Sequence, residues 1–388
     1  MLVPVSERLQ QMDHDRVVER IWRKDHTVWK DDPTEIADRL GWLTVSDLMH
    51  ERIGELVAFA DQAAADGFET AVLLGMGGSS LAPEVFMRTF GAADGALELI
   101  VLDTTHPATI ERVVGQLELG TTLFIVASKS GGTTETLSHL AFFWDKVPNG
   151  TQFIAITDPG TSLETQARER GFRAVFVNPD DIGGRYSALS YFGLVPAALI
   201  GAPLHEVLDR AEEMQTASER TIPAAQSPGA TLGAMMGESA KAGRDKLTIA
   251  LPEEIASFGS WVEQLIAEST GKEGVGIVPV VGEPLGTPDV YGQDRVFVAI
   301  GEHGRLDELE NVGHPVVRLP YDGREQIGGE FFRWEMATAI AGYVLGINPF
   351  DQPNVQEAKD NTGKVLEQFA SEGALPEVEE GTDEALRS

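Results

Sequence analysis

Short apolar runs alternate with longer amphipathic stretches from residue 69 onward, and this alternation is the main regularity of the chain. The first series of apolar runs comprises Ala71–Leu74, Leu97–Leu102, Leu123–Val126, Phe153–Ile156 and Ala174–Val177. The second series comprises Leu247–Leu251, Gly276–Val281, Val296–Ile300 and Val316–Leu319. Continuous apolar strands separated by helices are typical of parallel sheets that are covered on both faces. The pattern therefore predicts an α/β protein with two doubly wound parallel-sheet lobes, each a three-layer αβα sandwich.

The remaining segments complete the predicted domain organisation. The first segment is polar with a helical pattern, and we expect Trp22, Trp29 and Trp42 to dock it onto the main body. The last segment is acidic, contains proline and glycine, and is expected to be poorly ordered. The predicted parts are a helical segment (1–55), a first lobe (56–200), a helical connection (201–225), a second lobe (226–370) and an acidic tail (371–388).

Charge and composition narrow the class of partner. The chain has 388 residues, with 61 acidic against 30 basic side chains and a formal net charge of −31. Nucleic acids and anionic membranes need basic surfaces, so both are excluded as expected partners. The sequence has no cysteine, which excludes disulfides, thiolate metal sites and cysteine nucleophiles. An anionic substrate would need a site that concentrates the few cations and backbone N–H groups locally.

The N-terminal residues lack the basic and apolar regions of a signal peptide. No apolar run approaches the roughly 18 residues that a membrane span needs. We therefore expect a cytoplasmic enzyme without a membrane partner.

The stretch Val126-Ala-Ser-Lys-Ser-Gly-Gly-Thr-Thr-Glu-Thr136 carries the strongest chemical signal, because it links a predicted strand to a predicted helix. Backbone N–H groups at a helix N-terminus bind phosphate, and glycines let the backbone approach the ligand. The short polar donors are Ser128, Ser130, Thr133 and Thr134, and the single cation is Lys129. The spacing is not that of a Walker loop. The stretch predicts a phosphate-binding loop; the alternative is an ordinary Ser/Thr-rich helix cap.

The helix that follows offers two further predictions. Its expected buried stripe consists of Leu137, Leu140, Ala141 and Trp144. Glu135 and His139 lie at i and i+4 and could form a metal pair, but no third ligand and no H-E-x-x-H motif accompanies them. We therefore predict no metal site.

A second glycine-rich loop, Leu74-Gly-Met-Gly-Gly-Ser-Ser80, follows the first predicted strand. Gly75 and Gly77 match the start of a dinucleotide-binding fingerprint, and Asp103 after the next strand could be its ribose-binding acid. However, Ser80 stands where the third glycine belongs. One pyrophosphate also does not need two such loops on neighbouring strands, so a nicotinamide-dependent oxidoreductase is the weaker alternative.

Two more segments present charged side chains in specific settings. In Gly183-Gly-Arg-Tyr-Ser187 the paired glycines permit a tight backbone that presents Arg185, which could stabilise an oxyanion or simply clamp the structure. In the helix over 258–271, Trp261, Leu265 and Glu268 share one face, whereas Glu263 lies on the opposite, wet side. A carboxylate on an apolar stripe near the negative end of a helix is suited to act as a base. The alternative is a salt bridge from Glu268 to Lys272 or to an arginine elsewhere.

The last segment of interest is Asn348-Pro-Phe-Asp-Gln-Pro-Asn-Val-Gln-Glu-Ala-Lys359. Two prolines shape a loop, and a helix is expected to begin near Asn354. Gln352 precedes this helix and Lys359 lies on its second turn. By itself the segment is consistent with an ordinary surface helix.

Together these five segments resemble the phosphoglucose isomerase family, which is built from two sugar-isomerase (SIS) domains. The resemblance runs from about Val72 to Lys359, and the opening Ile-Trp-Arg-Lys-Asp and the Gly-Met-Gly-Gly-Ser-Ser loop look closest to the isomerase half of transaldolase–isomerase fusion proteins. It implies interconversion of glucose 6-phosphate and fructose 6-phosphate through a cis-enediol(ate), with no metal or organic cofactor, by a homodimer. The implied catalytic residues are Glu268 as the base, Arg185 as the enediolate stabiliser, and Lys359. The implied substrate-binding residues are Gly77, Gly78, Ser79, Ser128, Lys129, Ser130, Thr133 and Gln352.

One departure from the family pattern concerns ring opening. The family's ring-opening histidine stands downstream of the base in a Gly-Gln-His context, whereas this chain has Gly292-Gln-Asp294. His303 and His314 are the only histidines after Glu268, and neither lies in the family's motif. A non-catalytic or incomplete sugar-phosphate-binding SIS protein therefore remains the main alternative to an active isomerase.

Overall fold

The computed structural model describes residues 5–374 of the chain. The chain forms two compact units, residues 1–350 and residues 351–388, and both sheets belong to the first unit. The strands are β1 (Thr70–Leu74), β2 (Glu98–Leu102), β3 (Thr122–Ala127), β4 (Phe153–Thr157), β5 (Ala174–Val177), β6 (Lys246–Ala250), β7 (Val278–Val281), β8 (Arg295–Ile300) and β9 (Val316–Leu319). Each strand coincides with a predicted apolar run, differing by two residues or fewer at either end.

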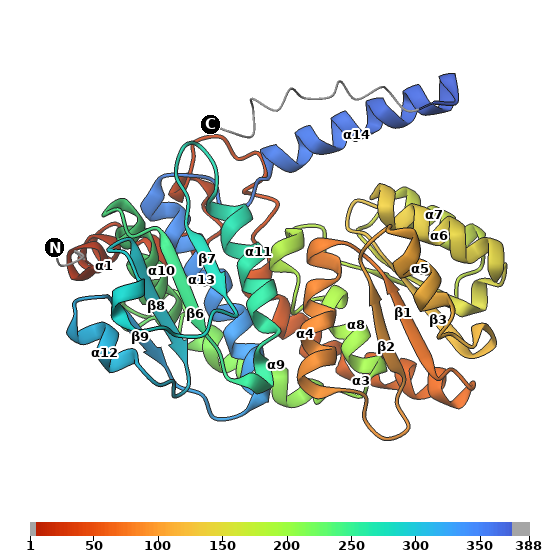
Figure 1. Cartoon of the computed structure of the whole chain (residues 1–388), viewed down its shortest axis with the longest axis horizontal. Helices are drawn as coiled ribbons and strands as arrows, with labels where there is room; N and C mark the ends of the chain where they lie inside the picture. Colours follow the sequence, from red (N-terminus) through yellow and green to blue (C-terminus); the bar gives the residue numbers. More distant parts are fainter. Residues whose placement is uncertain (1–4, 375–388) are drawn as a thin grey trace. The chain divides into compact units, whose positions relative to one another are not determined.

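The helices alternate with the strands along most of the first unit (Figure 1). They are α1 (Val5–His14), α2 (Val17–Trp22), α3 (Val45–Ala65), α4 (Leu81–Phe90), α5 (Pro107–Val114), α6 (Thr134–Lys146), α7 (Ser162–Glu169), α8 (Tyr191–Leu199), α9 (Leu204–Thr216), α10 (Pro228–Lys241), α11 (Phe258–Thr270), α12 (Leu306–Asn311) and α13 (Ile327–Leu345). Helix α14 (Pro353–Glu372) belongs to the second unit.

Every strand pairing in the two sheets is parallel. The first sheet has the order β2-β1-β3-β4-β5, and the second has the order β7-β6-β8-β9. The register pairs Leu74 of β1 with Val126 of β3, so these strands end side by side. The strand order changes direction between β1 and β3, because β2 follows β1 on one side and β3 lies on the other. Ligands bind at such a switch point in open α/β sheets. The predicted α/β fold with two doubly wound parallel sheets is confirmed.

The first sheet is buried on both faces. Along β3, Leu123 and Ile125 face the large core that includes the helices α4 and α8, while Phe124 and Val126 face a second apolar core under α6 and α7. Successive residues of a strand point to opposite faces, so each strand contributes to both cores. This explains why the strands appear in the sequence as continuous apolar runs rather than as alternating ones.

The second sheet is apolar mainly on one face. Leu247 and Val298 contribute to the same large core as the first sheet. On the other face Phe297 belongs to a small cluster with Tyr291 and Leu309, the latter on the short helix α12. The two sheets therefore share one continuous core, although the second has a thinner outer layer.

The N-terminal segment docks through its tryptophans, as predicted. The indole Nε1 of Trp22 donates to the carbonyl of Ser218 (2.6 Å), and that of Trp29 donates to the carbonyl of Ala339 (2.8 Å). The ring of Trp42 lies 5.5 Å from that of Tyr186 and 5.7 Å from that of Phe332. Each aromatic body is buried against the main core, and the indoles of Trp22 and Trp29 find a backbone partner for their polar group.

The buried face of α6 differs from the predicted one. Its buried residues are Thr136, His139, Leu140 and Phe143, whereas Ala141 is exposed and Leu137 and Trp144 are partly buried. His139 donates to the carbonyl of Thr104 through Nε2 (3.0 Å), and burial lowers its pKa. The other ring nitrogen of His139, Nδ1, is buried without a hydrogen-bonding partner. The predicted stripe is confirmed for Leu140 and for the partly buried Leu137 and Trp144, which pack against the same core, and it is wrong for Ala141.

Helix α14 begins one residue before the predicted position and runs to Glu372. Most of the predicted acidic tail lies outside the described residues. The predicted boundaries of the two lobes stay predictions. Within residues 5–374, no helix combines the length and the apolar character that crossing a bilayer requires.

Candidate active site

Three loops that follow strands of the first sheet carry most of the predicted site residues. The loop after β1 forms a 3₁₀ turn, η3 (Gly77–Ser79), the loop after β3 leads into α6, and the loop after β5 forms η6 (Gly184–Tyr186). Because all strands are parallel, these loops leave the same edge of the sheet. The fold therefore brings together the glycine loop, the predicted phosphate loop and the arginine loop.

The glycine loop and the arginine loop are in close contact. A Cβ atom on Gly78 would lie 2.3 Å from the carbonyl oxygen of Gly184, so this position excludes any side chain. Gly77 has a φ of +54°, which glycine adopts without strain, and its Cβ would lie 2.8 Å from Nε2 of Gln264. The glycines thus serve loop packing beside Arg185, and the hydroxyl of Ser80 donates back to the carbonyl of Gly77 (3.1 Å).

Arg185 lies beneath this contact and is almost completely buried, with 4% of its side chain exposed. Its Nε donates to Oγ of Ser269 (3.0 Å), and its Nη1 donates to Oε1 of Glu268 (2.9 Å). A third donor, Nη2, is 3.3 Å from the carbonyl oxygen of Pro349. Contacts at three nitrogens fix the plane of the guanidinium, so its charge is held in one orientation.

Glu268 lies in the last turn of α11 and comes from the second half of the molecule. Trp261 and Leu265 are buried on the same face, whereas Glu263 is exposed, which confirms the predicted helix face. The carboxylate is 23% exposed, so one side of it remains open to a ligand. The alternative interpretation of Glu268, a salt bridge to an arginine elsewhere, is what the structure shows, and the arginine is another of the predicted catalytic residues. The role of Glu268 as a base stays a prediction.

Gln264 is a site residue that the sequence did not single out. It lies one turn before Glu268 on α11, and its Nε2 donates to Oε2 of Glu268 (3.2 Å). Arg185 and Gln264 therefore hold the two carboxylate oxygens separately. A glutamine at i−4 of a glutamate is too common on helices to be recognised, and only its approach to Gly77 distinguishes it.

The predicted phosphate loop has its hydroxyl groups arranged around the start of α6. Ser128 is buried and its Oγ lies 2.8 Å from Oγ1 of Thr133. Thr133 is the N-cap residue of α6, yet its side chain makes no capping hydrogen bond. Ser130 is exposed and its Oγ accepts from the amide of Gly132 (3.3 Å). The interpretation as an ordinary helix cap is therefore weakened, because the Thr133 side chain satisfies none of the first-turn N–H groups.

Two contacts hold this loop against the next strand–helix unit. Gly131 has a φ of +67°, and its Cβ would lie 2.6 Å from Cβ of Thr161, so the loop needs glycine there. Lys129 forms an ion pair with Asp158, the residue after β4. Burial raises the pKa of Asp158, although the pairing with Lys129 opposes this effect. The one cation of the loop thus has an anionic partner that the sequence analysis did not identify.

The two C-terminal candidates lie in the second compact unit. Gln352 is the N-cap residue of α14, and Lys359 lies within this helix. The side chain of Lys359 lies outside the part of the chain that the structure describes. The assignment of Gln352 and Lys359 to the site stays a prediction.

The residues considered for ring opening are engaged elsewhere. His303 contacts the carbonyl of Ile300 through Nε2 (2.8 Å). His314 is buried against Phe297, and burial lowers its pKa. Asp294 is paired with Lys246 at the amino ends of β8 and β6 (2.7 Å), the edge opposite to that from which the strand-exit loops leave. None of these three contacts involves Arg185 or Glu268.

Comparisons with known proteins identify the family of this chain. The family model for phosphoglucose isomerase matches residues 35–290. The glucose-6-phosphate isomerase of Synechococcus sp. (strain JA-3-3Ab) is 35% identical over 357 residues, which cover 77% of this chain and 66% of that protein. The chain thus spans about two thirds of the length of this relative.

Two solved structures share the fold. The crystal structure of a glucose-6-phosphate isomerase from Chlamydia trachomatis aligns with a TM-score of 0.78 at 18% identity, over 98% of this chain and 88% of that one. A hypothetical protein from Thermus thermophilus aligns with a TM-score of 0.78 at 24% identity, over 93% of this chain and 97% of that one. With the family model covering more than half of its residues, the chain belongs to the phosphoglucose isomerase family.

Proposed function

We propose that this chain interconverts glucose 6-phosphate and fructose 6-phosphate. The observation that carries the proposal is the pair formed by Arg185 and Glu268, which places a fixed positive charge 2.9 Å from a partly exposed carboxylate. This pair adjoins the glycine loop at Gly77, which lies next to the phosphate loop because β1 and β3 are neighbours. A base, a cation and a phosphate cradle at one edge are what an aldose–ketose isomerisation of a sugar phosphate needs.

The phosphate group would bind at the start of α6. Backbone N–H groups of the first helical turn, the hydroxyls of Ser128, Ser130 and Thr133, and the ammonium of Lys129 supply donors of the required kind. Concentrating these donors overcomes the unfavourable net charge of −31 at this one place. The side chain of Lys129 is 25% exposed, so it can contact a phosphate from its partner position beside Asp158.

The sugar would extend from the phosphate loop over Gly77, Gly78 and Ser79 towards Glu268. The carboxylate removes the proton from C2 of the open-chain aldose, which leaves a cis-enediol(ate), and the same group returns the proton to C1. Arg185 stabilises the negative charge that develops on the enediolate oxygen. Removal of one such preorganised donor typically costs about 2.7–4 kcal/mol of transition-state stabilisation.

Gln264 and Ser269 have supporting roles in this proposal. Gln264 donates to the carboxylate oxygen of Glu268 that Arg185 does not contact, and Ser269 accepts from Nε of Arg185. Both contacts orient the reacting groups before the substrate binds. The chain is further proposed to act as a homodimer, to be checked by light scattering on the purified protein.

The test is isomerisation of fructose 6-phosphate, coupled to a glucose-6-phosphate dehydrogenase, without added metal. We expect activity in the unmodified chain and a loss of about 10²–10⁴-fold in Glu268→Gln, since that is the contribution of a positioned base. Glu263→Gln is the matched control because it lies on the exposed side of the same helix and should retain full activity.

Binding distinguishes the proposal from its main alternative. If the unmodified chain lacks activity but binds a sugar-phosphate analogue of the enediolate, it is a sugar-phosphate-binding protein and not an isomerase. If it neither turns over nor binds, the proposal is wrong in both parts. Equal activity in Glu268→Gln and in the unmodified chain would instead remove Glu268 from the role of base.

A further inference from the structure

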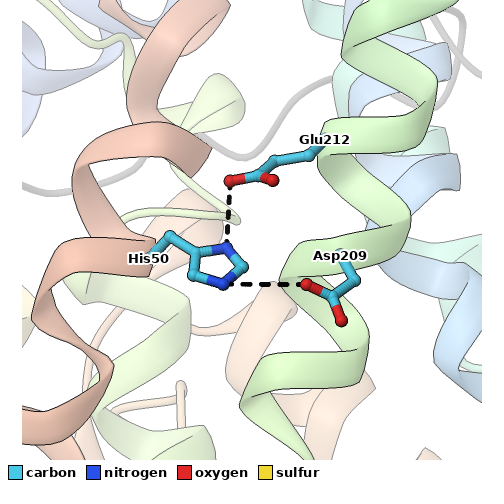
Figure 2. A group of neighbouring side chains, drawn as sticks. All are labelled: His50, Asp209 and Glu212. Carbon is cyan, nitrogen blue, oxygen red and sulfur yellow. Dashed lines mark ion pairs between the residues drawn. The ribbon is translucent and has the colours of Figure 1, made fainter.

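A cluster of two histidines and two carboxylates lies on the facing surfaces of α3 and α9, away from the residues discussed so far. His50 comes from α3, and Asp209 and Glu212 come from α9 (Figure 2). His205 lies one turn before Asp209, and its ring centroid is 5.8 Å from that of His50. Imidazole and carboxylate groups are the preferred nitrogen and oxygen ligands of zinc, so this composition suits a metal ion.

The first argument is the separation between His50 and Asp209. Nε2 of His50 lies 3.6 Å from Oδ1 of Asp209, which is too long for a hydrogen bond. Two donors bound to one tetrahedral zinc, each at about 2.0–2.1 Å from the metal, lie about 3.4 Å apart. The gap therefore matches two ligands on one ion better than it matches a direct contact.

The second argument is the position of Glu212 at the other ring nitrogen. Figure 2 shows the imidazole of His50 with one carboxylate at each nitrogen. Oε1 of Glu212 lies 3.0 Å from Nδ1, at the distance of an ion pair, although Nδ1 does not meet the angle of a hydrogen bond. Metal-bound histidines almost always direct their other nitrogen at a carboxylate or carbonyl, which fixes the tautomer and the orientation of the ring.

The third argument is the spacing along α9. His205 and Asp209 lie at i and i+4, so they share one face of the helix. The ligand atoms that already lie within 4.8 Å of one another are those of His50, Asp209 and Glu212, so the side chain of His205 must rotate to bind the same ion as Asp209. Both are exposed and can adjust their rotamers, whereas His50 is more buried, with 29% of its side chain exposed. Because His50 is half-buried while His205 and Asp209 are exposed, a metal ion can reach the site from solvent.

We propose that His50 (through Nε2), His205 and Asp209 form a binding site for a divalent transition-metal ion such as Zn²⁺, with Glu212 orienting the ring of His50. Water completes the tetrahedron. The ion cross-links the helix that precedes the first sheet to the helix that connects the two sheets. Its role is structural, because the site shares no residue with the proposed isomerase reaction.

The test is a titration of the full, chelator-treated chain with ZnCl₂ by calorimetry, together with Co²⁺ absorption spectroscopy. We expect one Zn²⁺ per chain and the visible bands of tetrahedral Co²⁺. Loss of a group that only orients a ligand costs about 10–100-fold in metal affinity, so His205→Asn combined with Asp209→Asn should weaken binding by about 100-fold or more. Both positions are exposed, so the double variant should fold normally.

Controls separate a metal site from the alternatives. Glu206→Gln removes one exposed negative charge from the same helix outside the cluster and should bind Zn²⁺ as the unmodified chain does. Glu212→Gln should weaken binding less than Asp209→Asn. Zn²⁺ should also raise the melting temperature of the unmodified chain but not that of the double variant, since a ligand that binds the folded state stabilises it. No saturable binding, or equal affinity in every variant, would mean that the cluster is an ion pair between His50 and two carboxylates and nothing more.

Discussion

The two halves of the molecule have similar sheets but contribute differently to the candidate site. The first sheet contributes three loops from one edge, which hold the glycines, the hydroxyls, Lys129 and Arg185. The second half contributes Glu268, which lies in the last turn of the thirteen-residue helix α11. None of the predicted site residues lies in a loop that leaves a strand of the second sheet. The comparison teaches that, in the proposed function, one half would recognise the ligand through backbone and loops, whereas the other would supply the base from a helix.

The packing of the two sheets fits this division. The first sheet has an apolar core on each face, so its edge loops are anchored to a rigid base. The outer face of the second sheet carries polar contacts as well, since Arg295 donates from Nη1 to Oγ1 of Thr248 (2.7 Å) and pairs with Glu283 (3.0 Å). Its inner side is fixed instead by α10 and α13, and α11 packs on α13 with Glu268 at its end.

The largest effect is expected where the two halves meet. Arg185→Gln removes the charge at the proposed enediolate and leaves Glu268 without its cation, so kcat should fall by about 10²–10³-fold. Binding of inorganic phosphate, measured by calorimetry, should change little because Arg185 does not belong to the phosphate loop. Arg173→Gln, which breaks a surface pair with Asp66, is the control. A loss of phosphate binding in Arg185→Gln would end the division of roles between the halves.

The next effect concerns the backbone contact between two loops of the first half. Gly78→Ala places a methyl group 2.3 Å from the carbonyl oxygen of Gly184, and neither backbone can move freely. We expect a loss of about 1–3 kcal/mol in the free energy of unfolding, measured with denaturant, and lower activity because Arg185 shifts with its loop. Gly120→Ala, where a Cβ would meet open space, should be close to neutral. Normal stability and activity in Gly78→Ala would show that the loops are not held rigidly.

A pH-dependent effect is expected in the second half. Glu335 on α13 is completely buried, and burial raises its pKa well above the ordinary value, which favours its neutral form in the folded state. Its contribution to stability is therefore full below the unfolded pKa and is lost as the pH rises towards the folded pKa. Glu335→Gln should match the unmodified chain near pH 4 and exceed it increasingly above that, by up to about 1.4 kcal/mol per pH unit.

Denaturant unfolding of both proteins from pH 4 to pH 9 measures this difference directly. Taking the difference between the two proteins cancels the other titrating groups. A constant difference across the range would mean that Glu335 titrates alike in both states. Among the described residues of the half that contains the first sheet, one buried carboxylate oxygen lacks a hydrogen-bonding partner. It is Oδ1 of Asp158.

The smallest effect is expected at Asp158 in the first half. Asp158→Asn removes the anion that pairs with Lys129 and should tighten binding of inorganic phosphate by about two- to fivefold, as expected for a single partly exposed ion pair. Asp180→Asn, an exposed charge near Asp158, distinguishes the specific pair from the general effect of removing a negative charge. Weaker phosphate binding in Asp158→Asn would show that the aspartate positions Lys129 rather than competing for it.

The sequence predicted the strands well because strands buried on both faces form continuous apolar runs, as in Leu123–Val126. It also placed three candidate loops at the carboxyl ends of strands of one sheet, where glycines and hydroxyls are suited to bind a ligand. On α6 it wrongly included Ala141 and missed Thr136 and His139, which are polar residues on the buried face; Nε2 of His139 bonds to a carbonyl 35 residues away.

The pairings between site residues could not be predicted. Arg185 and Glu268 are separated by 83 residues, and Lys129 and Asp158 by 29. Such pairs depend on how the loops and helices meet in three dimensions, which local patterns do not encode. Gln264 was missed for the same reason, since its role depends on Gly77 lying opposite.

The anchoring of the N-terminal tryptophans has a consequence for synthesis of the chain. Trp29 bonds to a carbonyl that is 310 residues later in the sequence. At about 5–20 residues per second of translation, that partner emerges some 15–60 s after the tryptophan. During this interval Trp29 lacks the carbonyl to which it bonds, so the nascent chain is expected to depend on chaperones until α13 has left the ribosome.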